Sequence, residues 1–142
     1  MFDPSQADVR RFFCDTWRRH RDGEPLTPLQ AIALDWIVEH PEYHGDLDSI
    51  ERALEARYDA GTAANPFLHL SMHLSISEQF SIDQPPGIRA GCEALARRHG
   101  SMHEAAHQVM ECLGEMLWRS QRSGTPPDGL AYVECVRRRA GS

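Results

Sequence analysis

The histidines of this chain are the residues whose type and spacing could do chemistry. Six of the eight form three pairs spaced four residues apart, namely His40/His44, His69/His73 and His103/His107. Random placement at this composition would give roughly 0.4 such pairs. Residues four apart share one face of a helix, where two neutral imidazoles can bind one divalent ion. The spacing therefore predicts a metal site, although it specifies no reaction.

The pair His69/His73 falls on a predicted helix from residue 66 to about residue 80. Asn65 can cap this helix, and Pro66 suits its first turn. With 3.6 residues per turn, both rings lie on the apolar face, away from the serines and the acidic residue of the segment. A buried polar group without a partner costs about 1–3 kcal/mol, so both rings need partners. A metal ion is one solution, and a buried hydrogen-bond network is the other.

The pair His103/His107 falls on a predicted helix from residue 101 to about residue 122. Both rings border its apolar stripe, and Glu111 follows one turn later. Two imidazoles and a carboxylate at this spacing are a reasonable ligand set for Zn²⁺, Fe²⁺ or Mn²⁺. Glu104 is discounted as a ligand, because it is expected to form a capping box with Ser101.

Further candidate ligands lie in and just after a predicted helix over residues 27–39. This helix is apolar nearly all round, so we expect it to be central and Asp35 to be buried on it. A buried carboxylate is paired with a cation or bound to a metal, and an arginine partner is the alternative reading for Asp35. His40 and His44 flank Pro41, which ends the helix, and a turn there can still direct both rings into a site.

We interpret the sequence as a metal-binding protein of unknown reaction whose cofactor is a divalent zinc, iron or manganese ion. The alternative is a non-enzymatic adaptor or regulatory protein in which the histidines form a structural network. Nucleophile-elbow, P-loop and dinucleotide-binding patterns are missing from the sequence, so whether it is an enzyme stays open. The candidate metal ligands are His69, His73, His103, His107, Glu111, Asp35, His44 and His40.

The elements that must position these residues are all expected to be helices. Capping residues and Pro/Gly turns predict helices over about 5–20, 27–39, 48–58, 66–80, 88–98 and 101–122, and one from about 128. The helix over 48–58 is expected to end at Gly61. We therefore predict an all-α bundle of four main helices with shorter accessory ones, forming a single domain over residues 1–142.

Composition limits the setting in which such a protein works. The net charge of −6 argues against non-specific nucleic-acid binding. The lack of a long apolar run and of a signal-peptide layout argues against a membrane and favours the cytoplasm. The four cysteines form no CxxC pair, so in a reducing compartment they are expected to be packed thiols. A homo-oligomer or a protein partner stays open.

Four segments of the chain resemble the bacterial domain-of-unknown-function family 1841. They are His40-Pro41-Glu42-Tyr43-His44, Asn65 to His73, Ser81 to Gly87, and Met110 to Trp118. The resemblance spans nearly the whole chain and implies a single compact bacterial domain. It implies no activity, so the functional reading depends on the residues themselves.

Overall fold

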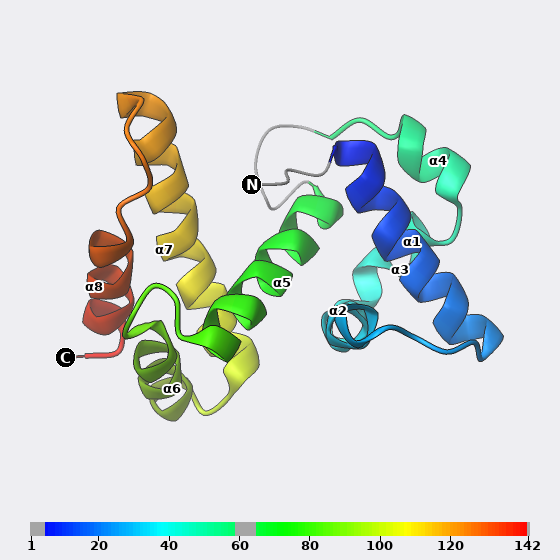
Figure 1. Cartoon of the computed structure of the whole chain (residues 1–142). Coiled ribbons are helices and arrows are strands. Elements are labelled where there is room, and N and C mark those ends of the chain that lie inside the picture. Colours follow the sequence, from blue (N-terminus) through cyan, green and yellow to red (C-terminus); the bar gives the residue numbers. More distant parts are fainter. Residues whose placement is uncertain (1–4, 59–64, 142) are drawn as a thin grey trace. The chain divides into compact units, whose positions relative to one another are not determined.

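The computed structural model describes residues 5–58 and 65–141, and every regular element in these ranges is helical (Figure 1). The all-α class is therefore confirmed. The elements are α1 (Gln6–Asp22), α2 (Pro28–Val38), the 3₁₀ turn η1 (Pro41–Tyr43), α3 (His44–Leu47), α4 (Ile50–Glu55), α5 (Pro66–Ile82), α6 (Ile88–His99), α7 (Met102–Ser123) and α8 (Gly129–Arg139). The expected stop at Gly61 lies outside the described residues.

The chain divides into two units, Met1–Leu74 and Ser75–Ser142, and α5 continues from the first into the second. In the first unit, α1 packs against α2, α3 and α4. In the second, α6, α7 and α8 pack against one another. The expectation of one domain over residues 1–142 stays a prediction.

Local capping explains why the helices begin where they do. The Ser5 side chain accepts a hydrogen bond from the amide of Asp8, and the side chain of Asp128 caps α8. Thr27 and Gln30 form a reciprocal capping box at the start of α2. Each bond satisfies an amide that has no partner within its own helix. The helix starts expected at these residues agree with the structure.

The core of the first unit lies between α1, α2 and the first turns of α5. Phe13, Ile37, Phe67 and Leu70 are among its buried side chains. Arg10 is also buried there, and its guanidinium donates to the carbonyls of Ala53 at 2.6 Å and Ala56 at 2.7 Å. It thus supplies donors at the end of α4, where helical carbonyls lack partners. One cation fixes the end of α4 against α1.

The expectation that α2 is buried nearly all round is wrong. Leu29 and Val38 are 48% and 53% exposed, and Asp35 and Glu39 lie on the exposed side as well. The helix contacts the core through one face, which includes Ala33 and Ile37. An apolar residue on a protein surface is common, so apolar composition alone did not reveal which face is buried.

The expectation of four packed thiols is wrong for two of the cysteines. Cys112 of α7 and Cys135 of α8 form a disulfide, with their Cα atoms 5.8 Å apart. Cys14 and Cys92 are buried free thiols, as expected. Residues 23 apart in sequence meet here because α7 and α8 pack side by side.

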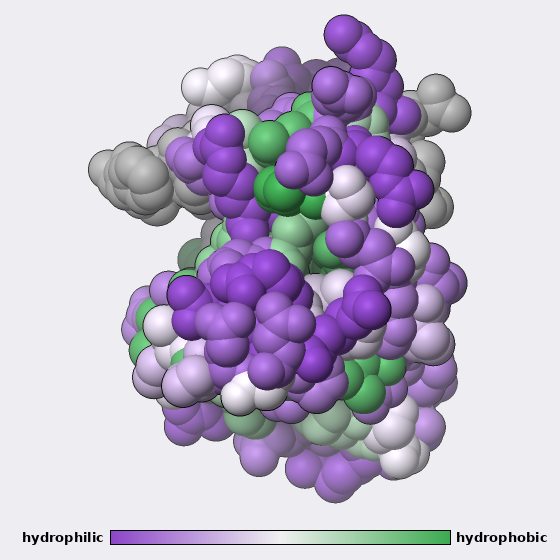
Figure 2. Space-filling view, turned by 90° about the vertical axis from the view of Figure 1, so that its right-hand side faces the viewer, coloured by the Kyte–Doolittle hydropathy of each residue, from purple (hydrophilic) through white to green (hydrophobic). Residues whose placement is uncertain are grey.

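Hydrophilic side chains predominate on the face shown in Figure 2, and hydrophobic ones emerge between them in limited areas. Within the described residues, no helix combines the length and the apolar character that crossing a bilayer requires.

Candidate metal centre

The segment after α2 uses two histidines to complete the end of that helix. Pro41 has no amide hydrogen, so it cannot donate to the carbonyl of Ile37 one turn earlier. The Nε2 atom of His44 contacts this carbonyl at 2.9 Å, and Nδ1 of His40 contacts the carbonyl of Trp36 at 2.7 Å. Imidazole groups therefore add donors at the helix end, where the Ile37 carbonyl also accepts from the backbone amide of His40 at 3.1 Å. This capping turns the His40 ring back toward the core, where it is 3% exposed.

Three imidazole nitrogens converge within the first unit. His69 Nε2 lies 3.1 Å from His40 Nε2 and 3.1 Å from His73 Nε2. The ligand atoms of these three residues all lie within 4.8 Å of one another. Two nitrogens bound tetrahedrally to one zinc ion at 2.0–2.1 Å are ~3.3 Å apart, so the observed spacing suits a shared ion.

Proton positions limit how well hydrogen bonds alone can satisfy this cluster. A carbonyl only accepts, so His40 Nδ1 carries the hydrogen and Nε2 of the neutral ring presents a lone pair. If His69 Nε2 carries a hydrogen and donates it to that lone pair, the same nitrogen cannot accept a hydrogen bond from His73. If it accepts from His73 instead, it faces the lone pair of His40. With neutral rings, one of the two 3.1 Å contacts is therefore poorly matched, whereas a cation accepts all three lone pairs.

Aromatic rings enclose two of the three histidines. The indole of Trp36 stacks on His73, which is fully buried, with ring centroids 4.0 Å apart. The Tyr43 ring is parallel to that of His40 at 5.2 Å. Burial raises the pKa of the Tyr43 hydroxyl, and the carboxylates of Glu42 and Asp46 add to this. These walls hold the rings in place and restrict water, as expected of the hydrophobic shell around a metal site.

The structure does not bring two of the candidate ligands of this unit to the cluster. His44 caps α2 and stacks on Trp17, with ring centroids 4.1 Å apart. Asp35 is exposed on α2. The cluster of His40, His69 and His73 therefore presents nitrogen ligands only.

The remaining candidates lie in the second unit. The rings of His103 and His107 are half-buried on α7, with centroids 4.7 Å apart and nearly perpendicular planes. Glu111 is 60% exposed and accepts a hydrogen bond from Arg139 of α8, so it is engaged in an ion pair. Ligation by His103 and His107 stays a prediction.

The sequence did not predict that Trp36 and Tyr43 would lie against the histidine cluster, and His40 was the last of the candidate ligands. Trp36 lies four residues before His40, a spacing that places its carbonyl within reach of a side chain that caps the helix. The signal was the proline directly after His40, because it both ends the helix and removes a donor. Tyr43 carries no comparable signal in its sequence neighbourhood.

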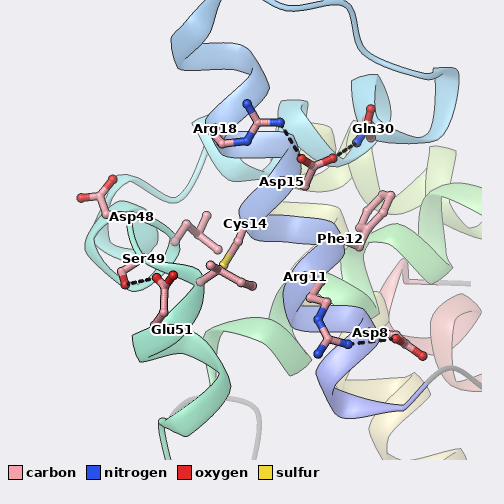
Figure 3. A pocket seen from close by; sticks show the side chains of 12 residues that line it. Asp8, Arg11, Phe12, Cys14, Asp15, Arg18, Gln30, Asp48, Ser49 and Glu51 are labelled. Carbon is pink, nitrogen blue, oxygen red and sulfur yellow. Dashed lines mark hydrogen bonds and ion pairs between the residues drawn. The ribbon is translucent and has the colours of Figure 1, made fainter.

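A pocket of about 630 Å³ lies elsewhere in the first unit, between α1 and the α3–α4 segment (Figure 3). Its charged rim is largely paired, since Asp15 accepts from Arg18 at 2.9 Å and from Gln30 at 3.1 Å. The hydrogen bonds from Arg19 and Arg18 hold the pKa of Asp15 below its usual value. Burial raises the pKa of the Cys14 thiol in the wall to about 11, so this thiol is not a ready nucleophile. The pocket therefore offers no evident reactive group.

Comparison with known proteins gives one match. A family model described as a domain of unknown function, DUF1841, matches residues 5–138. No curated protein and no solved structure matches the chain.

Proposed function

The chain belongs to the DUF1841 family, whose function is unknown, and we propose from its own residues that it is a metal-binding protein. In this proposal His40, His69 and His73 bind one divalent ion through their Nε2 atoms. The observation that carries it is the pair of 3.1 Å contacts that His69 Nε2 makes with the other two nitrogens.

The ligand set favours some metals over others. Imidazole nitrogen suits zinc, iron, copper and nickel, whereas manganese prefers carboxylate oxygen. Since Asp35 is exposed on α2 and the cluster offers imidazole nitrogen only, zinc or iron is favoured over manganese. His40 also has the hydrogen bond that is usual for a histidine ligand: its other ring nitrogen donates to a backbone carbonyl, which fixes the tautomer and the orientation of the ring.

Elemental analysis of the purified protein tests this proposal. We expect close to one equivalent of metal in protein made without added metal and purified without a chelator. His69→Ala should lower the retained metal to less than ~0.2 equivalents, because it removes the nitrogen that contacts both others. His20→Ala is the matched control, since His20 is an exposed histidine of the same unit.

Two outcomes of this experiment separate the alternatives. Wild-type protein that retains no metal and does not take up zinc in a titration favours the histidines as a structural hydrogen-bond network. Full retention by folded His69→Ala protein excludes this cluster as the site. His107→Ala in the same assay tests the prediction that the second unit contributes ligands.

We also propose that the protein acts in the cytoplasm without binding nucleic acid or membrane. The net charge of −6 supports the absence of nucleic-acid binding, because a nucleic acid is a polyanion and repels an acidic protein. Cell fractionation and a lipid-vesicle sedimentation assay test the proposal. Recovery in the membrane fraction would contradict it.

A further inference from the structure

The disulfide of the second unit forms part of the wall of a pocket. This pocket has a volume of about 330 Å³ and lies against α7 and α8. Both Cys112 and Cys135 line it, and the two are bonded to each other. A small molecule in the pocket would therefore contact the two residues that carry the sulfur–sulfur bond.

The two sulfur-bearing residues differ in accessibility. Cys135 is 8% exposed, whereas Cys112 is 1% exposed and lies on the buried face of α7. Thiol–disulfide exchange requires the attacking thiolate to reach one particular sulfur in line with the bond. The sulfur of Cys135 is the more accessible target, and Cys112 is then the leaving group.

Charges around the pocket bear on that attack. Three acidic and two basic side chains line it: Glu115, Asp128, Glu134, Arg119 and Arg138. Glu115 is paired with Arg119 at 2.7 Å, and Asp128 caps α8. Arg138 lies three residues after Cys135, hence on the same side of α8. A guanidinium in this position favours a thiolate near the bond.

The disulfide is one of several connections that hold α8 in place. The Tyr132 hydroxyl donates to Gln79 at 2.6 Å, and Arg139 donates to Gln108 at 2.9 Å. Val136 is fully buried, and a Cβ added at Gly91 of α6 would meet it at 2.8 Å. Such close packing holds α8 against α6 without the disulfide. Cleavage of the bond should therefore leave α8 docked and ready to form the bond again.

We propose that Cys112–Cys135 is a reversible exchange site for low-molecular-weight thiols. A thiolate attacks the Cys135 sulfur and forms a mixed disulfide, while Cys112 departs with the electron pair and takes a proton from water. A second thiolate then attacks the small-molecule sulfur of the mixed disulfide, releasing Cys135 as a thiolate and the small disulfide as product. Two thiols thus supply two electrons, and the reverse steps oxidise the protein again.

Equilibration of the whole protein in glutathione buffers of varied redox ratio tests this. Acid quenching, alkylation and peptide mass spectrometry report the state of each cysteine. We expect the pair to change from fully oxidised to fully reduced across the series and to return on reversal, with the helical circular dichroism unchanged. A bond that never forms in oxidised glutathione, one that persists in about 10 mM reduced glutathione, or one whose cleavage unfolds the helices overturns the proposal.

Single-cysteine variants test the direction of attack. In Cys112→Ser, oxidised glutathione should modify Cys135. In Cys135→Ser, it should modify Cys112 at least about tenfold more slowly, because that thiol is more deeply buried. Equal rates in the two folded variants, or faster modification of Cys112, contradict the assignment of Cys135 as the attacked sulfur. Neither variant replaces a candidate metal ligand, so the assay reads out the cysteines and not metal binding.

Discussion

His40 links the end of a helix to the proposed metal centre through the two nitrogens of one ring. Nδ1 contacts the Trp36 carbonyl at 2.7 Å, and Nε2 faces His69 at 3.1 Å. The carbonyl fixes the tautomer, so the nitrogen that faces the cluster is the one able to bind a metal. The same bond that completes α2 thus prepares the ligand.

Arg10 provides a prediction about stability at the scale of one residue. Replacing it with methionine keeps much of the side-chain volume but leaves the carbonyls of Ala53 and Ala56 without their donors. We expect Arg10→Met to lower the free energy of unfolding by about 3 kcal/mol, since hydrogen bonds from a charged group are the stronger ones. Urea denaturation measures this. The exposed neighbour Arg11, changed to methionine, is the control and should change stability by less than about 0.5 kcal/mol.

The thiol of Cys92 provides a prediction about pH. Burial, with a smaller contribution from Glu93, raises its pKa from 9.0 to about 11. The native thiol therefore keeps its proton while the unfolded one loses it, so its contribution to stability is present below pH 9 and is lost as the pH rises toward 11. At pH 8.5 we expect iodoacetamide to modify Cys92 much more slowly in native protein than in urea. Equal rates would show that the thiol is accessible in the native state.

At the scale of elements, the short segment from His40 to His44 completes α2 and sets where the centre lies. A helix that ends before proline leaves carbonyls short of donors, and here two side chains donate to them. In the proposed centre, His44 therefore positions the helix end that carries His40 and is not itself a ligand.

His44→Ala tests this positioning role. It removes one of the two donors to the Ile37 carbonyl and the stacking on Trp17, so we expect a loss of about 1–2 kcal/mol in unfolding free energy. Zinc should still bind with one equivalent per chain, but more weakly. Isothermal titration calorimetry separates the number of sites from the affinity. Complete loss of the site in a folded variant would instead identify His44 as a ligand.

The same elements show what the sequence could and could not reveal. Caps are local, so Thr27 and Ser101 predicted helix starts correctly. The buried face of α2 depends on what packs against it, and the pairing of Cys112 with Cys135 depends on the register of α7 against α8. Neither feature can be predicted from a short stretch of sequence, because both depend on residues far apart along the chain. The grouping of His69 and His73 followed from helical spacing, whereas the closeness of His40 required the turn after α2.

At the scale of the whole molecule, charge is distributed unevenly between the two units. Residues 1–74 carry thirteen acidic and seven basic side chains, and residues 75–142 carry eight of each. The net charge of −6 therefore belongs to the unit that contains His40, His69 and His73. An acidic surface raises the local concentration of cations, which favours loading of the centre at low ionic strength.

Removal of the metal should affect the molecule locally. If metal is present at about 100 times its dissociation constant, binding adds ~2.7 kcal/mol to stability, so a chelator should lower the melting temperature by roughly 5–10 °C. Hydrogen exchange should increase in α2 and in the first turns of α5, which carry or adjoin the three rings. Unchanged protection in these segments would contradict the proposal. Increased exchange at the start of α7 would support a role for His103 and His107.

The most direct test is the X-ray absorption spectrum of the zinc-loaded protein, recorded at the metal edge. Three imidazoles on one ion predict a first shell of nitrogen or oxygen atoms at ~2.0–2.1 Å, with strong multiple scattering from about three rings. The scattering should fall by about one ring in His69→Ala if zinc is still retained, and should be unchanged in His20→Ala. A first shell without imidazole scattering, or with sulfur at ~2.3 Å, would contradict a centre built from His40, His69 and His73.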